Sequence, residues 1–148
     1  MYSYDYRISL GVQHPAVSSA DISARLGLER RFFRDAGTDL RGGDGRLIRV
    51  HGLTRVGFEL AAGKDGWLMD AWPQVVGILQ ARVELIQALN QEGADVGLRI
   101  AVYGKRAWAG FELDPALVRL MADLRLGFHL ETYFPDAPVE TEADDDET

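Results

Sequence analysis

Tyr2-Ser-Tyr-Asp-Tyr-Arg-Ile-Ser-Leu-Gly-Val12 alternates large apolar or aromatic side chains with polar or small ones. A period of two is typical of a β-strand with one buried face, because successive side chains of a strand point to opposite sides of the sheet. The same alternation recurs at residues 96–102 and 128–134. These strands predict a sheet that is apolar on one side and polar on the other.

Helical patterns separate the strands. A short helix that Ser18 or Ser19 can cap carries Ile22 and Leu26 on one face and ends at Gly27, and residues 70–92 carry apolar side chains at the helical period after Asp70 and Pro73. Asp114-Pro115 begins a third helix, which Gly127 ends. Residues 29–45 predict an exposed, mobile loop, and 111–113 a short strand. Residues 46–61 are extended, either as one bent strand or as a hairpin.

This order favours the α+β class: a two-layer domain with a mainly antiparallel sheet of five or six strands and three helices packed on one face, of ferredoxin-like type. The strand order stays open. The chain has 148 residues, 47% of them apolar and 26% charged, which fits a single globular domain over residues 1–135. Zero cysteines exclude disulfides, thiolate zinc sites and cysteine nucleophiles. With no export signal and no long apolar run, we expect a cytoplasmic protein that does not enter membranes.

The net charge of −7 belongs to the end of the chain. Residues 136–148 hold seven acids and no Lys or Arg, which leaves 16 acids and 16 bases in the rest. Such a composition predicts an acidic disordered tail, because it cannot bury enough apolar surface to offset the entropy of ordering. Residues 25–55, by contrast, hold eight arginines against four acids.

Three stretches carry a family resemblance: Ile8–Val12 leading to Ala20–Leu28, Phe58–Leu60 before the long helix, and Glu112–Val118 through Leu124–Gly127 to Tyr133-Phe134. Their order and spacing resemble the bacterial family catalogued as domain of unknown function 4279. The resemblance implies a bacterial, cytoplasmic protein. It brings no catalytic or ligand residues with it.

Carboxylates and arginines share the polar phase of the predicted strands. If those strands are adjacent, the charged side chains converge on one face and form a ligand-binding surface or an acid/base pair. A solvated face with ion pairs is the more common outcome in antiparallel sheets. The candidate ligand-binding residues are Arg7, Arg55, Glu59, Arg99, Glu112 and Glu131, and the candidate partner-binding residues are Arg30, Arg31, Arg34 and Arg41.

Complete catalytic motifs are missing from the sequence. The Gly-rich loop at residues 41–46 lacks the Gly-Lys-Ser/Thr of a phosphate-binding loop, and no Gly-x-Ser-x-Gly elbow occurs. His14, His51 and His129 lie in three separate elements, so no metal site and no cofactor are expected. Nucleic-acid binding is disfavoured, because the tyrosines share the phase of the core and the tail would repel polyanions.

The sequence therefore favours a non-enzymatic protein-interaction module, of immunity or regulatory type, that docks an unknown protein partner. The alternative is a small-molecule-binding protein or hydrolase that uses the carboxylates and arginines of the polar sheet face. The two hypotheses differ in one geometric expectation: a cleft in which two of the carboxylates approach each other would favour the second. Self-association stays open.

Overall fold

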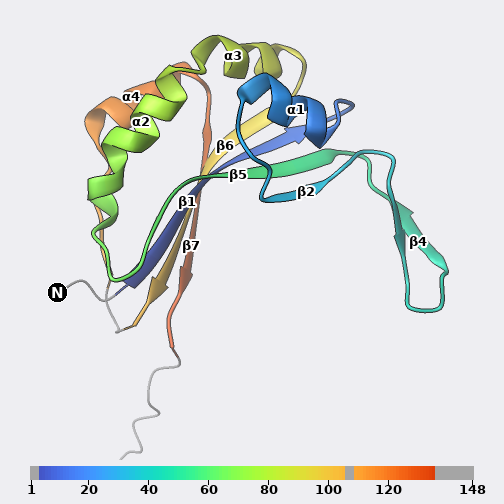
Figure 1. The fold of residues 1–148 in the computed structure, drawn as a ribbon, viewed down its shortest axis with the longest axis horizontal. Coiled ribbons are helices and arrows are strands. Elements are labelled where there is room, and N and C mark those ends of the chain that lie inside the picture. The colour runs from blue at the N-terminus through green and yellow to red at the C-terminus, as the bar shows by residue number, and fades with distance from the viewer. Residues whose placement is uncertain (1–3, 106–108, 136–148) are drawn as a thin grey trace, which may run out of the picture.

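The computed structural model of the protein describes residues 4–105 and 109–135. The strongly acidic segment 136–148 lies outside the described residues. Helices form one layer and a sheet forms the other, so the protein is of the α+β class (Figure 1). The five-stranded sheet has the order β2-β5-β1-β6-β7. Its strands are β1 (Tyr4–His14), β2 (Phe32–Arg34), β5 (Thr54–Gly63), β6 (Asp95–Gly104) and β7 (Gly127–Tyr133).

β1 is the central strand of the five-stranded sheet. It pairs antiparallel with β5 on one side and β6 on the other. Leu10 lies opposite Phe58 and opposite Leu98, and all three side chains are fully buried. A register shift between Ile8 and Ser9 marks a bulge in the β1–β5 pair.

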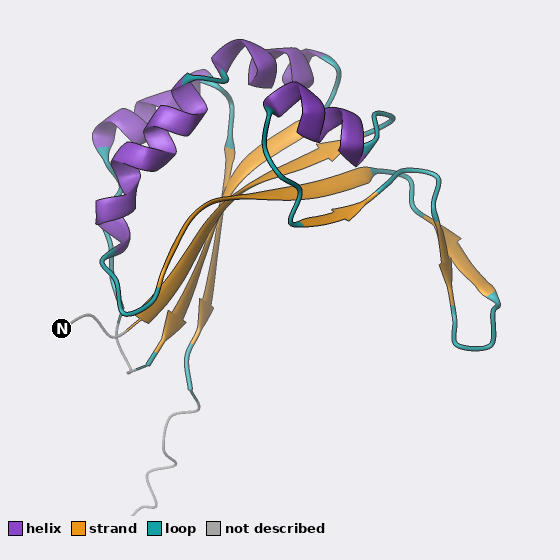
Figure 2. Ribbon diagram, in the orientation of Figure 1, coloured by secondary structure: helices purple, strands orange, loops and turns teal. Residues whose placement is uncertain are grey.

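All helices cover the apolar face of this sheet (Figures 1 and 2). They are α1 (Ser19–Leu26), the 3-10 turn η1 (Leu68–Ala71), α2 (Trp72–Gln80), α3 (Val83–Gln91) and α4 (Pro115–Asp123). The side chain of Ser18 accepts a hydrogen bond from the amide of Asp21, and Asp114 caps α4 in the same way. Leu79 and Ile86 are fully buried, which confirms the predicted apolar side of this helical region.

The prediction of one helix over residues 70–92 is wrong, because the helix breaks after Gln80. Arg82 has left the helical conformation, with φ −124 and ψ 15. Its side chain donates hydrogen bonds to the carbonyls of Leu26 (2.7 Å) and Ile78 (2.9 Å), so backbone acceptors near the break are satisfied. The break lets α2 and α3 run in different directions over the curved sheet (Figure 1).

The direction of the last strand also differs from expectation. β6 and β7 are parallel, and α4 lies between them in the chain as a crossover. The sheet is therefore mixed. Four α-helices are present in the described residues instead of three, and the ferredoxin-like topology is not confirmed.

The predicted loop at residues 29–45 contains two short strands. β2 extends the sheet beside β5, and β3 (Asp39–Arg41) pairs with β4 (Leu47–Val50) in a hairpin that projects away from the body (Figure 2). Residues 46–61 are neither one bent strand nor one hairpin, since β4 and β5 belong to different sheets. Residues 111–113 form no strand.

Candidate functional site: the polar face of the sheet

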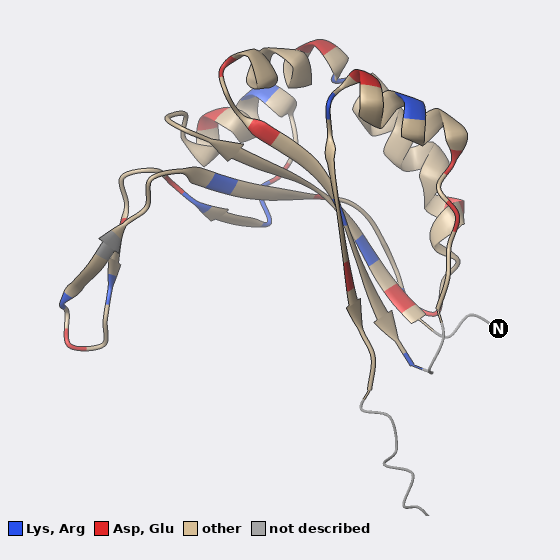
Figure 3. Cartoon of the chain, turned by 180° about the vertical axis from the view of Figure 1, so that it is seen from behind, with Lys and Arg blue, Asp and Glu red and all other residues tan. Residues whose placement is uncertain are grey.

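The face of the sheet opposite the helices is hollowed into a groove of about 1090 Å³. Alternate residues of β1, β5 and β6 point into it, because their neighbours on each of these strands are mostly buried under the helices, and residues of the edge strand β7 also line it. Both basic and acidic positions occur on β1, β5 and β6, while β7 carries only an acidic one, and Figure 3 shows these positions from behind. The charged residues that line the groove are Arg7, Arg31, Arg55, Glu59, Asp95, Arg99, Arg125, His129 and Glu131.

Glu59 on β5 is held by two arginines. Its Oε1 lies 3.0 Å from Arg7 Nε on β1 and 3.4 Å from an Arg31 terminal nitrogen. Arg7 Nε is shielded from solvent and has no aligned hydrogen bond within the described residues, so its contact with Glu59 is an ion pair only. Glu59 is thus paired with cations from two neighbouring segments of the chain.

Glu131 on β7 is the centre of a second cluster. Its carboxylate pairs with Arg99 on β6, lies 3.1 Å from His129 Nε2 and accepts a 2.8 Å hydrogen bond from the Tyr133 hydroxyl. Hydrogen bonds from Tyr133 and Arg99 hold the pKa of Glu131 below its ordinary value. Tyr133 stacks on Tyr103, with ring centroids 5.1 Å apart. Glu131 is thus a satisfied anion and a poor proton donor.

Arg55 differs from the other arginines of the groove that sequence analysis selected. No ion pair involves it within residues 4–105 and 109–135. It lines the groove and also a smaller neighbouring hollow of about 240 Å³, which Arg34 and His51 help to line. Arg55 is therefore a cation available to a partner.

Glu112 does not belong to the polar face. It lies in the chain before α4, on the helical side of the sheet, where its backbone carbonyl accepts a 2.7 Å hydrogen bond from Trp72 Nε1. The prediction that it joins Glu59 and Glu131 is wrong, because residues 111–113 are not a strand and have no sheet phase. The other five candidate ligand-binding residues do line the groove.

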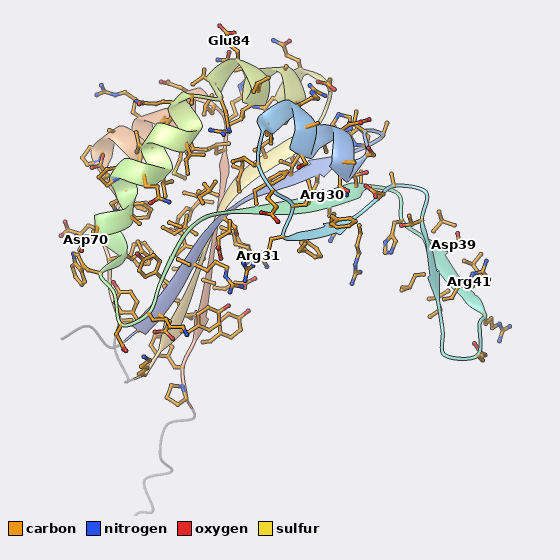
Figure 4. The ribbon with its side chains drawn as sticks, viewed as in Figure 1. Arg30, Arg31, Asp39, Arg41, Asp70 and Glu84 are labelled. Carbon is orange, nitrogen blue, oxygen red and sulfur yellow. The ribbon has the colours of Figure 1, made fainter. Side chains whose placement is uncertain are left out.

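Three of the four candidate partner-binding arginines, Arg30, Arg31 and Arg34, lie on or beside β2, and only Arg41 lies apart from them. Arg31 reaches Glu59, while Arg30 donates to Ser19 Oγ (2.9 Å) and lies 4.0 Å over the Phe33 ring. Arg41 is on the distant hairpin, where it pairs with Asp39 at 2.9 Å (Figure 4). The single basic loop expected from the sequence is not formed.

A row of glycines crosses the floor of the groove, and sequence analysis missed it. Gly57 on β5 lies opposite Gly11 on β1, Gly11 opposite Gly97 on β6, and Gly97 opposite Gly127 on β7. Each glycine appears in the sequence as an isolated polar-phase position of its strand. Only the register of the four strands brings the glycines together.

The arrangement is better suited to binding a charged partner than to acid/base catalysis. Glu59 and Glu131 lie on strands separated by β1 and β6, and each is neutralised by its own arginine. The described residues contain no group of three or more His, Cys, Asp or Glu side chains that could hold a metal ion. An acid/base pair would need two carboxylates in contact, and the groove keeps them apart.

Comparison of the chain with family models, with curated proteins and with solved structures finds no match. The resemblance to domain of unknown function 4279 therefore stays a prediction from the sequence motifs. None of the helices in the described ranges combines the length and apolarity that a bilayer crossing requires.

Proposed function

We propose that this protein is a non-enzymatic interaction module, of immunity or regulatory type, that binds an acidic surface of a protein partner in the groove of its polar sheet face. The proposed setting is a bacterial cytoplasm. One observation carries the proposal: the groove is lined by five arginines and three carboxylates. Glu59 and Glu131 are paired with three of these arginines, and the arginines still exceed the carboxylates by two, so the groove favours an anionic partner.

Arg125 supports a binding role independently. It follows the C-cap of α4 with φ 53, a left-handed conformation that glycine usually provides at helix ends. An arginine in this conformation costs stability, and the same residue lines the groove. Retaining a strained cation beside a hollow surface is typical of a functional site.

The size of the groove favours a macromolecule over a metabolite. Small-molecule pockets usually have volumes of about 300–1,000 Å³ and bury most of the ligand. The groove of about 1090 Å³ spreads over four strands and holds no convergent pair of carboxylates. A hydrolase acting through Glu59, Glu112 and Glu131 is disfavoured, since Glu112 lies on the other side of the sheet.

Affinity capture with matched variants tests the proposal. The immobilised protein is incubated with lysate of the native organism at low and at physiological ionic strength. We expect a specific acidic protein that is recovered better at low salt, because exposed charges are screened within about 8 Å at physiological salt. Arg55→Ala and Arg125→Gly should both reduce its recovery.

Arg41→Ala is the matched control, since it removes an arginine of the hairpin outside the groove. Equal recovery by all four proteins would exclude the groove as the binding surface. A metabolite that raises the melting temperature of the wild type but not of Glu59→Gln and Glu131→Gln would favour the small-molecule alternative instead.

A further inference from the structure

The strand β7 forms one edge of the five-stranded sheet, and its outer side is open. It pairs with β6 along its whole length without a register shift, so it is a regular strand. Every residue of β7 except Glu131 is exposed. Among the described residues, the hydrogen bonds that β7 makes beyond its pairing with β6 join side chains only. Its outer N–H and C=O groups therefore offer a template on which another strand can pair.

The usual protections of an edge strand are missing from β7. Edge strands of soluble proteins commonly carry a lysine, a proline or a bulge, or are very short, and each of these features hinders pairing with another chain. The sequence of β7, Gly-Phe-His-Leu-Glu-Thr-Tyr, contains neither lysine nor proline. The opposite edge of the sheet, by contrast, is formed by β2, which has only three residues. The open edge at β7 is thus well suited to strand addition.

Apolar side chains remain uncovered on the helical side of β7. Phe128 and Leu130 lie opposite Leu98 and Ile100 of β6, and both of these β6 residues are fully buried beneath the helices. Phe128 itself is 44% exposed and Leu130 is 45% exposed. The helical layer therefore stops short of this edge of the sheet. A strand added beyond β7 would remove part of this apolar surface from water.

The sequence of β7 is complementary to itself when two copies pair antiparallel around Leu130. This residue is the midpoint of Gly127–Tyr133, so a twofold axis through it pairs every residue of both strands. On the helical side, Leu130 then lies opposite Leu130 of the second copy, and Phe128 lies opposite Thr132 of the second copy. Residues directly opposite each other in an antiparallel pair point to the same face, so the helices of both copies lie on one side of the joined sheet.

The polar face selects the same register. His129 lies opposite Glu131 of the second copy, and Glu131 lies opposite the second copy's His129. An imidazole that can donate a hydrogen bond or carry a positive charge therefore meets a carboxylate twice. With the axis at His129 two imidazoles would face each other, and with the axis at Glu131 two carboxylates would. Both shifts also leave residues unpaired at the ends of the strands.

The contacts within one chain leave capacity for this pair. Glu131 already binds Arg99, His129 and the Tyr133 hydroxyl. A carboxylate has about four acceptor positions, so one of them remains for the second copy. The side chain of His129 is 61% exposed and is therefore accessible to that copy.

We propose that two copies of this chain form a symmetric dimer by antiparallel pairing of their β7 strands around Leu130, which joins the two sheets into one. A second copy is favoured over an unrelated strand, because both faces of β7 match their own sequence in the same register. A pair of seven-residue strands is small for an interface, so the dimer forms at high protein concentration and dissociates on dilution. The pairing does not depend on what the groove binds.

Sedimentation equilibrium of the full chain from about 10 µM to about 1 mM measures the dimer, whose fraction should grow with concentration. His129→Glu places carboxylates opposite each other across the interface and should weaken the dimer about tenfold or more. His129→Lys is the matched control, since it changes the same exposed position and should keep the dimer. A wild type that stays monomeric throughout, or equal association of the wild type and His129→Glu, would overturn the proposal.

Single cysteines test the position of the axis, since the chain contains none of its own. Leu130→Cys should form an intermolecular disulfide under mild oxidation, because Cβ atoms directly opposite each other are about 4.5–5.5 Å apart. Ile48→Cys is the control, because Ile48 is 62% exposed on the projecting hairpin. Equally fast cross-linking at the two positions would indicate random collisions and contradict the pairing.

A mixture of two variants tests the register. Phe128→Cys and Thr132→Cys should each cross-link slowly alone, because each position lies far from its own copy across the axis. Mixed together they should cross-link fast, since Phe128 and Thr132 of different copies lie opposite each other. Fast cross-linking of either variant alone, with no gain on mixing, would overturn the axis at Leu130. Should Phe128→Cys fold poorly, the two variants of the exposed His129 still decide the outcome.

Discussion

His14 at the end of β1 and Glu92 at the end of α3 are in contact, with Nε2 and Oε1 3.3 Å apart. The other ring nitrogen, Nδ1, accepts hydrogen bonds from the amides of Ala16 (3.0 Å) and Val17 (2.9 Å). Since Nδ1 accepts, Nε2 carries a proton and donates a hydrogen bond to Glu92 Oε1. Arg25 of α1 also binds Glu92 through two nitrogens at 2.8 and 2.5 Å, so one carboxylate joins α1, β1 and α3.

Glu92→Gln should remove part of the acid sensitivity of the fold. The two hydrogen bonds from Arg25 lower the pKa of Glu92 from 4.5 to about 2. A folded-state pKa below the unfolded value means that the contribution is complete above pH 4.5 and is lost as the pH falls from 4.5 to 2. Urea unfolding from neutral pH to pH 2 measures it. Glu84→Gln, at an exposed site on α3, should leave the pH dependence of the free energy of unfolding as it is in the wild type.

Leu79→Ala should lower the free energy of unfolding by about 2–5 kcal/mol, because Leu79 of α2 is fully buried and its loss leaves a cavity. The adjacent Gln80 is exposed, and Gln80→Ala should cost about 0.5 kcal/mol or less. Thermal and urea unfolding of the two variants give the comparison. Equal effects would contradict the packing of α2 on the sheet.

Trp72→Phe should lower the free energy of unfolding by about 1–3 kcal/mol, because the Glu112 backbone carbonyl loses its hydrogen bond from the indole N–H. Glu112→Gln keeps that backbone carbonyl and should cost about 0.5 kcal/mol or less. This pair measures, by chemical denaturation, whether Glu112 matters through its backbone or its carboxylate. A larger loss in Glu112→Gln would show an interaction of the side chain.

Arg125→Gly should raise the free energy of unfolding by up to about 1 kcal/mol, since glycine adopts the left-handed conformation without steric strain. Gly27 takes the corresponding place after α1, with φ 64. Gly27→Ala should lower stability by about 1 kcal/mol for the same reason. Differential scanning calorimetry of both variants measures the direction of each change in stability. A destabilised Arg125→Gly would mean that contacts of the arginine side chain outweigh its backbone strain.

Local patterns in the sequence predict the elements whose signals are local. The alternation of residues 2–12 and the Asp114-Pro115 cap both specify their element without reference to any other part of the chain. The break between α2 and α3 could not be predicted in this way, because apolar residues keep the helical period from Leu79 through Val83 to Ile86. Alternation likewise gives a strand its faces but not its direction, so the parallel β6–β7 pair needed the structure.

In the candidate site, too, features set within one strand could be predicted from the sequence, and features that depend on several segments could not. Arg7, Glu59 and Arg99 lie on the polar face, as the alternation of their strands predicts. The glycine row depends on cross-strand register, which no single strand contains. Glu112 was misplaced because the alternation of Phe111, Glu112 and Leu113 arises in a coil that packs beside Trp72.

The central position of β1 has a consequence for how the protein is made. β1 leaves the ribosome before either of its partners, since Val12 pairs with Val56 on β5 and with Val96 on β6. Pairing over such separations requires closing long loops, which slows folding relative to chains with local contacts. β1 therefore lacks its second partner until Gly104 has been synthesised, and until then its open edge and its apolar face are prone to aggregation.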